Sequence, residues 1–437
     1  MRKHYIGLDM LRGLGVFTLI WMHSAFYYFN GLYDLDLNNP PPVVTIIGLL
    51  LMFAGIFAMI SGVSHTFQFY RKLETQGYSN ISLLKYNTVG GLIILAIAYA
   101  YFIFTGPGLV QMADRAMNNS ILVDLIRNGL LHGFNMERIL YVDSLVMIGI
   151  NILLIGLVFL LVQKLAGSLP NGSYGKDGNI SDDNNQYELE KVHKRAARIF
   201  LISGLGFFVI SLLRIPLYGI YLDAVDQGNY GKVLLLNWLV NKNNPIMPYF
   251  SFSLLGGWIA TLLVINNWKK ILGNVLPVAI VLFIVGVFLY VKLPDTMLER
   301  SIDLKWFAIM TAQLGLFMML LVATLGIFDF RKNKAQKRLP PIAKFIYRFG
   351  VAGLSIFFIE SIASATIFRV INLFFPGTTF DLTGALLYGF CLAIIWGFIL
   401  QAWEKKQYKY GLEYFYVHIL RKFGSSTKEE KLKSGDI

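Results

Sequence analysis

The sequence contains a single cysteine and few charged residues. Cys391 is alone among 437 residues, so no disulfide can form within the chain. Charged residues make up 15% of the sequence, and no His, Cys or carboxylate side chains have metal-ligand spacing within one apolar run. Glycine-rich phosphate loops of the Walker and dinucleotide types are also missing. These absences exclude a disulfide scaffold and argue against a metal centre and against the common nucleotide-binding loops.

Long hydrophobic runs are abundant instead. Hydrophobic residues make up 56% of the chain, and they fall into blocks of about 20 residues, the length that crosses the hydrocarbon core of a bilayer. The sequence therefore predicts an all-α polytopic integral membrane protein with about ten transmembrane helices. We expect these spans near residues 8–29, 43–66, 88–105, 140–162, 197–221, 246–265, 272–292, 306–328, 346–373 and 380–402.

The positions of the basic residues give these spans an orientation. The formal net charge is +13, which by itself could indicate a nucleic-acid partner. With the amino terminus in the cytoplasm, the inner segments hold 27 Lys and Arg residues and the outer loops hold 7. The positive-inside rule thus explains the basic composition without nucleic acid. It predicts a multi-pass protein of the cell membrane with both termini in the cytoplasm.

Three segments lie outside the predicted spans. Residues 167–195 are rich in Gly, Asn and Asp, which predicts a cytoplasmic linker between a four-helix half (1–166) and a six-helix half (196–404). Residues 405–437 form a basic cytoplasmic tail. Residues 121–134 carry a helical apolar stripe that is too short and too charged to span, so we expect an interfacial helix on the outer face.

The first apolar run holds three ionisable side chains, Asp9, Arg12 and His23. Each charged acid or Arg at mid-depth costs roughly 2.5 to 3.5 kcal/mol. Arg12 and His23 are eleven residues apart, about three turns plus 20°, so they share one helix face with a rise of about 16 Å. This arrangement suits a buried polar pathway. The alternatives are a His23 bonded to a neighbouring carbonyl and an Arg12 that anchors topology by pairing with Asp9.

Two other intramembrane features need explanation. Glu360 stands near the middle of its span and must be protonated, paired or in contact with water. His23 and Arg214 are its candidate partners, and an interhelical structural pair is the alternative to a functional role; for Arg214 the alternative is snorkelling or local pairing. Pro245 and Pro248 predict a broken start to their span, and small residues around Ser61 predict close helix packing.

Several segments resemble the transmembrane acyltransferase superfamily. The first is Leu8-Asp9-x-Leu11-Arg12-Gly13, which is followed by His23 at the Arg-x10-His spacing of the acyltransferase-3 branch. Further segments are similar to the branch that contains heparan-alpha-glucosaminide N-acetyltransferase and its prokaryotic relatives. They are Phe57-x3-Ser61-Gly62, Pro245 to Gly257, Gly353-Leu354-Ser355 with Glu360-Ser361, and Tyr410-Gly411-Leu412-Glu413-Tyr414.

The resemblance implies a ten- or eleven-helix enzyme that transfers an acyl group, by expectation acetyl, from cytoplasmic acyl-CoA to a sugar amine or hydroxyl at the opposite face. His23 and Arg12 match the histidine and arginine of the acyltransferase-3 motif. His23 would be a general base or an acyl carrier, and Arg12 would bind the donor. We further expect Glu360 to be catalytic, Arg71, Lys72 and Lys85 on the next inner loop to contact the CoA phosphates, and Asp9, Ser61 and Arg214 to line the substrate pocket.

The expected partners are membrane lipids, acyl-CoA and a glycan or glycolipid acceptor, with a homodimer as one option for the oligomeric state. No metal is expected. The rival interpretation is a transporter or flippase without covalent chemistry, which would use the same intramembrane charges as a permeation path. Paired broken helices would favour that rival. A membrane scaffold is the third interpretation, and it leaves His23 and Glu360 unexplained.

Overall fold

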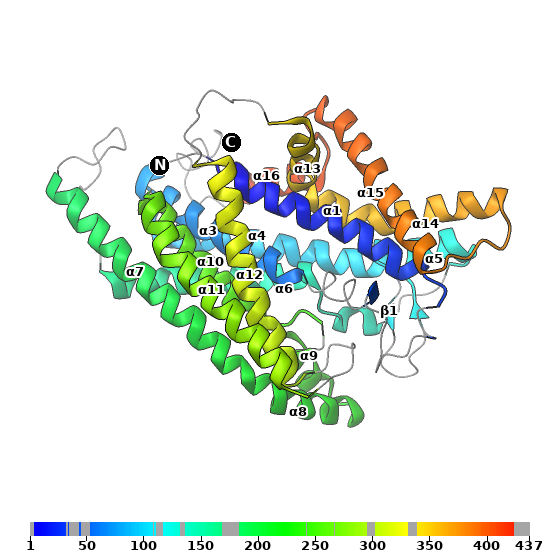
Figure 1. Ribbon diagram of the computed structural model, residues 1–437, viewed down its shortest axis with the longest axis horizontal. Helices are drawn as coiled ribbons and strands as arrows, with labels where there is room; N and C mark the ends of the chain where they lie inside the picture. The colour runs from blue at the N-terminus through cyan, green and yellow to red at the C-terminus, as the bar shows by residue number, and fades with distance from the viewer. Residues whose placement is uncertain are drawn as a thin grey trace.

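A computed structural model of the chain describes residues 4–31, 34, 43–44, 53–107, 109–110, 117–131, 136–167, 183–241, 243–265, 267–294, 302–330 and 339–423. Within these ranges the fold is almost entirely helical, as predicted. The regular strands in the described part of the chain are one short antiparallel pair, β1 (Leu109–Val110) and β2 (Met117–Asn118). Figure 1 shows the helices arranged as one elongated bundle.

The amino-terminal helices include short π and 3-10 turns. They are α1 (Ile6–Tyr28), α3 (Ala54–Gln76), α4 (Asn80–Ala100) with a π turn (Tyr101–Thr105), α5 (Ile121–Asn128), a 3-10 turn (Met136–Leu140) and α6 (Ser144–Ala166). The next group is α7 (Asp183–Ile210), a 3-10 turn (Ser211–Leu213), α8 (Arg214–Asp226), α9 (Tyr230–Val240), α10 (Ile246–Ile265), α11 (Trp268–Lys292) and α12 (Leu304–Phe328). The last helices are α13 (Pro341–Val351), α14 (Gly353–Phe374), α15 (Leu382–Glu404) and α16 (Leu412–Phe423).

Eight helical segments in the described part of the chain are long and apolar enough to cross a membrane. They are Asn80–Thr105, Ser144–Ala166, Tyr187–Asp226, Ile246–Ile265, Trp268–Lys292, Leu304–Phe328, Gly353–Phe374 and Leu382–Glu404. The helices α1 and α3 are as long but more polar, because they carry the ionisable residues of the first run and of the segment from His65 to Glu74. The fold is therefore that of a multi-pass membrane protein.

Several boundaries differ from those predicted. The helix α3 begins at Ala54 and continues to Gln76, whereas the prediction ended it near 66. The helix α7 begins at Asp183, so residues 183–195 are helical although the prediction placed them in the linker; residues 168–182 lie outside the described residues. The span predicted at 346–373 is interrupted at Ala352, where α13 ends and α14 begins. The break predicted before α10 is present, because Met247 has non-helical backbone angles.

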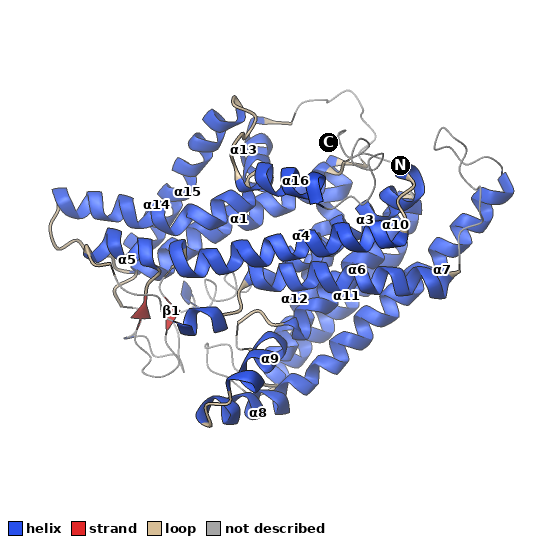
Figure 2. Ribbon diagram, turned by 180° about the vertical axis from the view of Figure 1, so that it is seen from behind, coloured by secondary structure: helices blue, strands red, loops and turns tan. Residues whose placement is uncertain are grey.

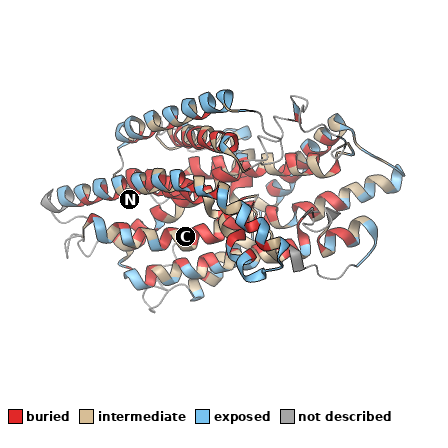
Figure 3. Cartoon of the chain, turned by 90° about the horizontal axis from the view of Figure 1, so that it is seen from below, coloured by how far each residue is buried: buried red, intermediate tan, exposed pale blue. Residues whose placement is uncertain are grey.

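Two packing groups meet along α1. One apolar core joins α3, α6, α7, α10, α11 and α12 with the amino-terminal end of α1, so it draws on both predicted halves of the chain. A second core joins the middle and far end of α1 with α13, α14 and α15. Figures 1 and 2 show α1 between these two groups. Buried faces turn inward throughout the bundle, and exposed faces cover its outside (Figure 3).

Small residues allow α3 and α10 to pack closely, as the sequence predicted. A Cβ placed on Gly62 would lie 2.1 Å from the carbonyl oxygen of Ser253, and one on Gly256 would lie 2.4 Å from that of Met59. Ser253 also donates a hydrogen bond of 2.9 Å to the carbonyl of Ala58. Because lipid offers no hydrophobic driving force between helices, such close contact is a main source of stability in a membrane.

Gly62→Ala should therefore destabilise the protein by about 1 to 3 kcal/mol, the usual cost of overpacking a tight contact. Thermal unfolding of the purified protein in detergent measures this loss. Gly206→Ala is the matched control, since a Cβ on Gly206 meets nothing within 4 Å. That change should be neutral or slightly stabilising, because Ala is the better helix former. Equal melting temperatures for the two variants would contradict the packing argument.

Candidate functional site

His23 of α1 and Glu360 of α14 form a pair, in which the carboxylate is buried and the imidazole is partly buried. The Nδ1 atom of His23 lies 3.2 Å from Oε1 of Glu360, whose side chain is only 2% exposed. The Oγ atom of Ser361 donates a 2.8 Å hydrogen bond to the same carboxylate oxygen. The rings of Tyr27 and Phe357 lie against the imidazole, with centroids 5.8 and 6.4 Å away. Of the two partners predicted for Glu360, the structure selects His23.

A small polar hollow opens beside this pair. Side chains of α1, α14 and α5 line it, together with Pro107: Ser24, Tyr27, Tyr28, Pro107, Val123, Arg127, Glu360, Ser361 and Ser364. The centre of a water molecule can move through about 10 Å³ of it, which is room for roughly one water. The hollow thus brings the Glu360 carboxylate, several hydroxyls and the Arg127 guanidinium together in a confined space. The His23 imidazole is next to this carboxylate.

The helix α5 covers the hollow. It was predicted as an interfacial helix, and it is a short amphipathic helix that ends at Asn128. The guanidinium of Arg127 lies 4.8 Å from the centre of the Tyr28 ring. Arg369 of α14 donates a 2.6 Å hydrogen bond to the carbonyl of Ile126. Figures 1 and 2 show α5 beside α14. These contacts hold α5 against α1 and α14, the two helices that carry His23 and Glu360.

The other end of α1 carries a second polar cluster. Arg12 donates a 2.8 Å hydrogen bond to Oδ1 of Asp9 and a 3.3 Å bond to the carbonyl of Gly350. The Nε2 atom of His4 lies 2.7 Å from Oδ2 of Asp9, and this hydrogen bond raises the pKa of His4. The Arg12 side chain remains 33% exposed. The predicted Asp9–Arg12 pairing is therefore present, on the same uninterrupted helix as His23 and about 16 Å from it along the axis.

Ser61 lies near this second cluster. Its Oγ atom is 3.3 Å from Nδ1 of His65, and its carbonyl accepts a 2.9 Å hydrogen bond from the same nitrogen. Arg12 acts electrostatically on His65, which places Ser61 and Arg12 in one neighbourhood. Asp9, Arg12 and Ser61 are thus close together, but they are not beside Glu360.

Arg214 occupies a different place from the predicted pocket. It is buried and donates hydrogen bonds to the carbonyls of Val240, at 3.2 Å, and Asn241. Its guanidinium lies 4.3 Å from the centre of the Trp306 ring. In Figures 1 and 2 the α8–α9 region lies well apart from α14. The structure therefore does not bring Arg214 together with His23 and Glu360, and its side chain is paired locally with backbone carbonyls.

The three basic residues predicted to contact CoA phosphates are on helices, not on a loop. Arg71 and Lys72 belong to the last turns of α3, and Lys85 belongs to the start of α4. The ammonium group of Lys72 is buried, 4.2 Å from the ring centre of Tyr78 and 4.0 Å from that of Tyr86. Lys85 is exposed and Arg71 is partly exposed. Cation–π contact therefore gives Lys72 a structural role.

A second buried His–Glu pair was not anticipated. The Nε2 atom of His193 on α7 lies 2.7 Å from Oε1 of Glu74 on α3, and both side chains are almost fully buried. The Tyr70 ring packs edge-on against the imidazole at 5.1 Å. Glu74 and His193 both lie in polar segments near the predicted cytoplasmic ends of the spans. A charged residue in such a segment predicts only contact with solvent. Nothing in the sequence distinguishes them from surface residues.

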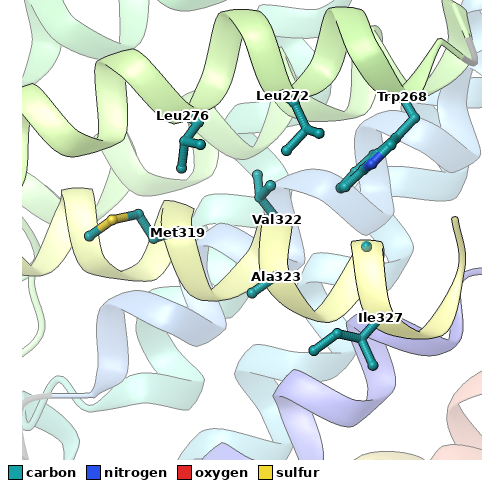
Figure 4. A pocket seen from close by; sticks show the side chains of 8 residues that line it. Trp268, Leu272, Leu276, Met319, Val322, Ala323 and Ile327 are labelled. Carbon is teal, nitrogen blue, oxygen red and sulfur yellow. The ribbon is translucent and has the colours of Figure 1, made fainter. Parts of the chain in front are cut away.

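The larger of the two principal hollows lies elsewhere and carries no chemistry. It is an open apolar groove of about 480 Å³ between α11 and α12 (Figure 4), lined by Trp268, Leu272, Leu276, Met319, Val322, Ala323, Gly326 and Ile327. In the described part of the chain, no three His, Cys, Asp or Glu residues gather as metal ligands would.

Comparison with known proteins adds no assignment. The sequence matches no family model, and it matches no curated protein. The interpretation of the site therefore depends on its residues and their geometry.

The His23–Glu360 contact makes a prediction about stability. Glu360→Leu should destabilise the protein by about 1 to 3 kcal/mol, because the partly buried His23 nitrogen and the buried Ser361 hydroxyl lose their partner. Glu360→Gln keeps a polar partner and should cost less. The double change Glu360→Leu with His23→Phe should recover part of the loss, since both polar partners are then gone. Melting temperatures in detergent that are identical for wild type and Glu360→Leu would refute the pairing.

Proposed function

We propose that this protein is a membrane-embedded acyltransferase. It moves an acyl group, by expectation acetyl, from cytoplasmic acyl-CoA to an amine or hydroxyl of a glycan or glycolipid at the outer face. The observation that carries the proposal is the contact of His23 with the buried Glu360, because His23 lies on the same uninterrupted helix as the partly exposed Arg12. A donor site at one end and a base at the other suit transfer across a membrane.

The chemistry assigned to His23 is general base catalysis. Because Nδ1 faces the carboxylate of Glu360, Nε2 is the nitrogen available to an acceptor. The acceptor oxygen or nitrogen attacks the thioester carbonyl carbon while its proton passes to Nε2. The carbon–sulfur bond then breaks, and coenzyme A leaves as a thiolate that takes up the proton. Glu360 orients the imidazole and stabilises its protonated form.

Arg12 is assigned to the donor. Its guanidinium can hold a phosphate or a pantetheine carbonyl, and an extended pantetheine arm would then run the roughly 16 Å of helix rise to His23. Of the three cations assigned to the CoA phosphates, Lys85 is exposed and Arg71 is partly exposed, whereas Lys72 is buried against two tyrosine rings. We assign the acceptor to the side of the pair where the small hollow lies, lined by Glu360 and several hydroxyls.

The proposal includes ten spans, with α1 and α3 added to the eight apolar segments, and cytoplasmic termini. Single cysteines test the orientation in a Cys391→Ala background. Ile81→Cys, at the start of α4, should be protected from an impermeant reagent in intact cells, whereas Thr379→Cys, before α15, should be labelled. Both positions are exposed to solvent or lipid headgroups. Labelling at Ile81→Cys alone would invert the orientation.

A transporter is the second candidate, and one observation favours it. The chain has helix breaks at Met247, in the first turn of α10, and at Ala352, between α13 and α14. Discontinuous helices are typical of secondary transporters. Such a protein would move a substrate unchanged, so detection of acyl transfer separates the two candidates.

The proposed activity predicts different effects for substitutions of His23 and of Arg12, which lie toward the two ends of α1. His23→Ala should lower acyl transfer by on the order of 100-fold or more while donor binding stays nearly intact. Arg12→Ala should weaken donor binding, and Arg12→Lys should restore only part of it because the planar fork is missing. Transfer is measured from radiolabelled acetyl-CoA into membrane glycans.

Binding is measured by the thermal shift that acetyl-CoA produces relative to CoA, since a ligand at 100 times its dissociation constant stabilises by about 2.7 kcal/mol. Full transfer activity in a folded His23→Ala protein would reject the assigned mechanism. A wild-type protein that neither binds acetyl-CoA nor transfers its acyl group would reject the enzyme altogether.

A further inference from the structure

The amino-terminal end of α14 takes its cap from a distant part of the chain. The helix begins directly after Ala352, which provides no side-chain cap. The first N–H groups of a helix need acceptors from outside it. Here Oε1 of Glu413 accepts hydrogen bonds from the backbone N–H groups of Leu354, at 2.7 Å, and Ser355, at 3.0 Å. A carboxylate at this position also complements the positive end of the helix dipole.

The contact is reciprocal, so the first turns of α14 and α16 hold each other. The Oγ atom of Ser355 donates to Oε2 of Glu413 at 2.5 Å and accepts from the N–H of Leu412 at 2.7 Å. Gly411 permits this approach, because a Cβ there would lie 2.9 Å from the Ser355 hydroxyl. We call this set of residues, Gly411, Leu412, Glu413, Leu354 and Ser355, the α14–α16 clamp.

The α14–α16 clamp lies on the part of α14 that runs alongside α1. A Cβ on Gly353 would lie 3.2 Å from Val16 and 3.8 Å from Cδ of Arg12. Seven residues further along each helix, Glu360 contacts His23. The two helices therefore run parallel with matched spacing.

Ser364, one turn beyond Glu360 on α14, has its hydroxyl 3.4 Å from that of Ser24, the residue after His23 on α1. A slide of α14 along its axis would change both of these contacts. Glu413 holds α14 at the end where such a slide would begin.

The helix α16 is itself anchored on another element. The Tyr416 hydroxyl packs against α4, where a Cβ on Gly90 would lie 2.8 Å from it. Because α16 contacts α4, the position of α14 depends on α4 as well as on α1. We propose that Glu413 is a positioning residue, which fixes the axial register of α14 against α1 and thereby sets the His23–Glu360 contact. Its effect on catalysis rests on the proposed acyl transfer, whereas its effect on register does not.

Disulfide formation measures the register directly. Ser24→Cys and Ser364→Cys together, in a Cys391→Ala background, should crosslink under mild oxidation because the two hydroxyls are 3.4 Å apart. Adding Glu413→Ala should slow this crosslinking by on the order of tenfold, because α14 loses all three hydrogen bonds that it donates to the carboxylate. Glu413→Gln, which keeps an acceptor, should slow it less and serves if the alanine variant fails to fold.

Two controls separate the clamp from a general loss of acidic residues. Glu404→Gln removes a carboxylate that pairs with Arg348 and Lys344 but does not bond to α14, so crosslinking should be unchanged. Ser355→Ala should slow crosslinking as Glu413→Ala does, and the double variant should be no slower than either, because the two residues act as one unit. Crosslinking at the wild-type rate in a folded Glu413→Ala protein would overturn the proposal.

Activity gives an independent readout. Glu413→Ala should lower kcat for acyl transfer by on the order of tenfold and shift its pH profile, while KM for acetyl-CoA stays unchanged, because the His23–Glu360 contact is altered but Arg12 is not. A purely stabilising cap would lower the melting temperature and leave kcat of the folded protein intact, which would reject the positioning role. If the wild-type protein transfers no acyl group, the proposed function fails, and the crosslinking rates still decide whether Glu413 sets the register.

Discussion

The polar side chains of α1 impose the constraint that the other helices satisfy. Charged groups at membrane depth are stable only when they pair or face a cavity, so α1 cannot present these side chains to lipid. Helices α3 and α12 contact it on one side, and α13, α14 and α15 contact it on the other. Each polar end of α1 is completed by a neighbour, with Glu360 of α14 at one end and Gly350 of α13 at the other. The two packing groups are thus arranged around one helix.

The features that sequence predicts well are local in the chain. Helical spacing alone places Arg12 beside Asp9 and on the same face as His23, and α1 is uninterrupted between them. The high cost of a lone carboxylate at mid-depth also requires a partner for Glu360, and His23 was one of two candidates. The lengths of the apolar runs predict most of the spans, because the thickness of the bilayer fixes the length of a transmembrane helix. These inferences need no knowledge of how distant segments pack.

The features that sequence misses depend on distant contacts. Ser355 and Glu413 are 58 residues apart, and Glu74 and His193 are 119 apart, so neither pair has a helical period that would reveal it. Local pairing was an alternative for Arg214, but its partners are backbone carbonyls, which every residue carries, so the sequence does not identify them. The predicted end of α3 was too early, because Arg71 and Lys72 were expected on a loop. Cation–π contact instead keeps Lys72 inside the helical packing.

The stretch of α1 between its two polar ends has a consequence for the membrane itself. No ionisable side chain stands between Arg12 and His23, and Val16 and Ile20 in that stretch are almost fully buried. A chain of water or titratable groups along this helix would conduct protons and dissipate the electrochemical gradient. The apolar interval interrupts such a chain over roughly 10 Å or more of helix. Along α1 itself, no titratable side chain therefore links the Asp9–Arg12 pair to His23.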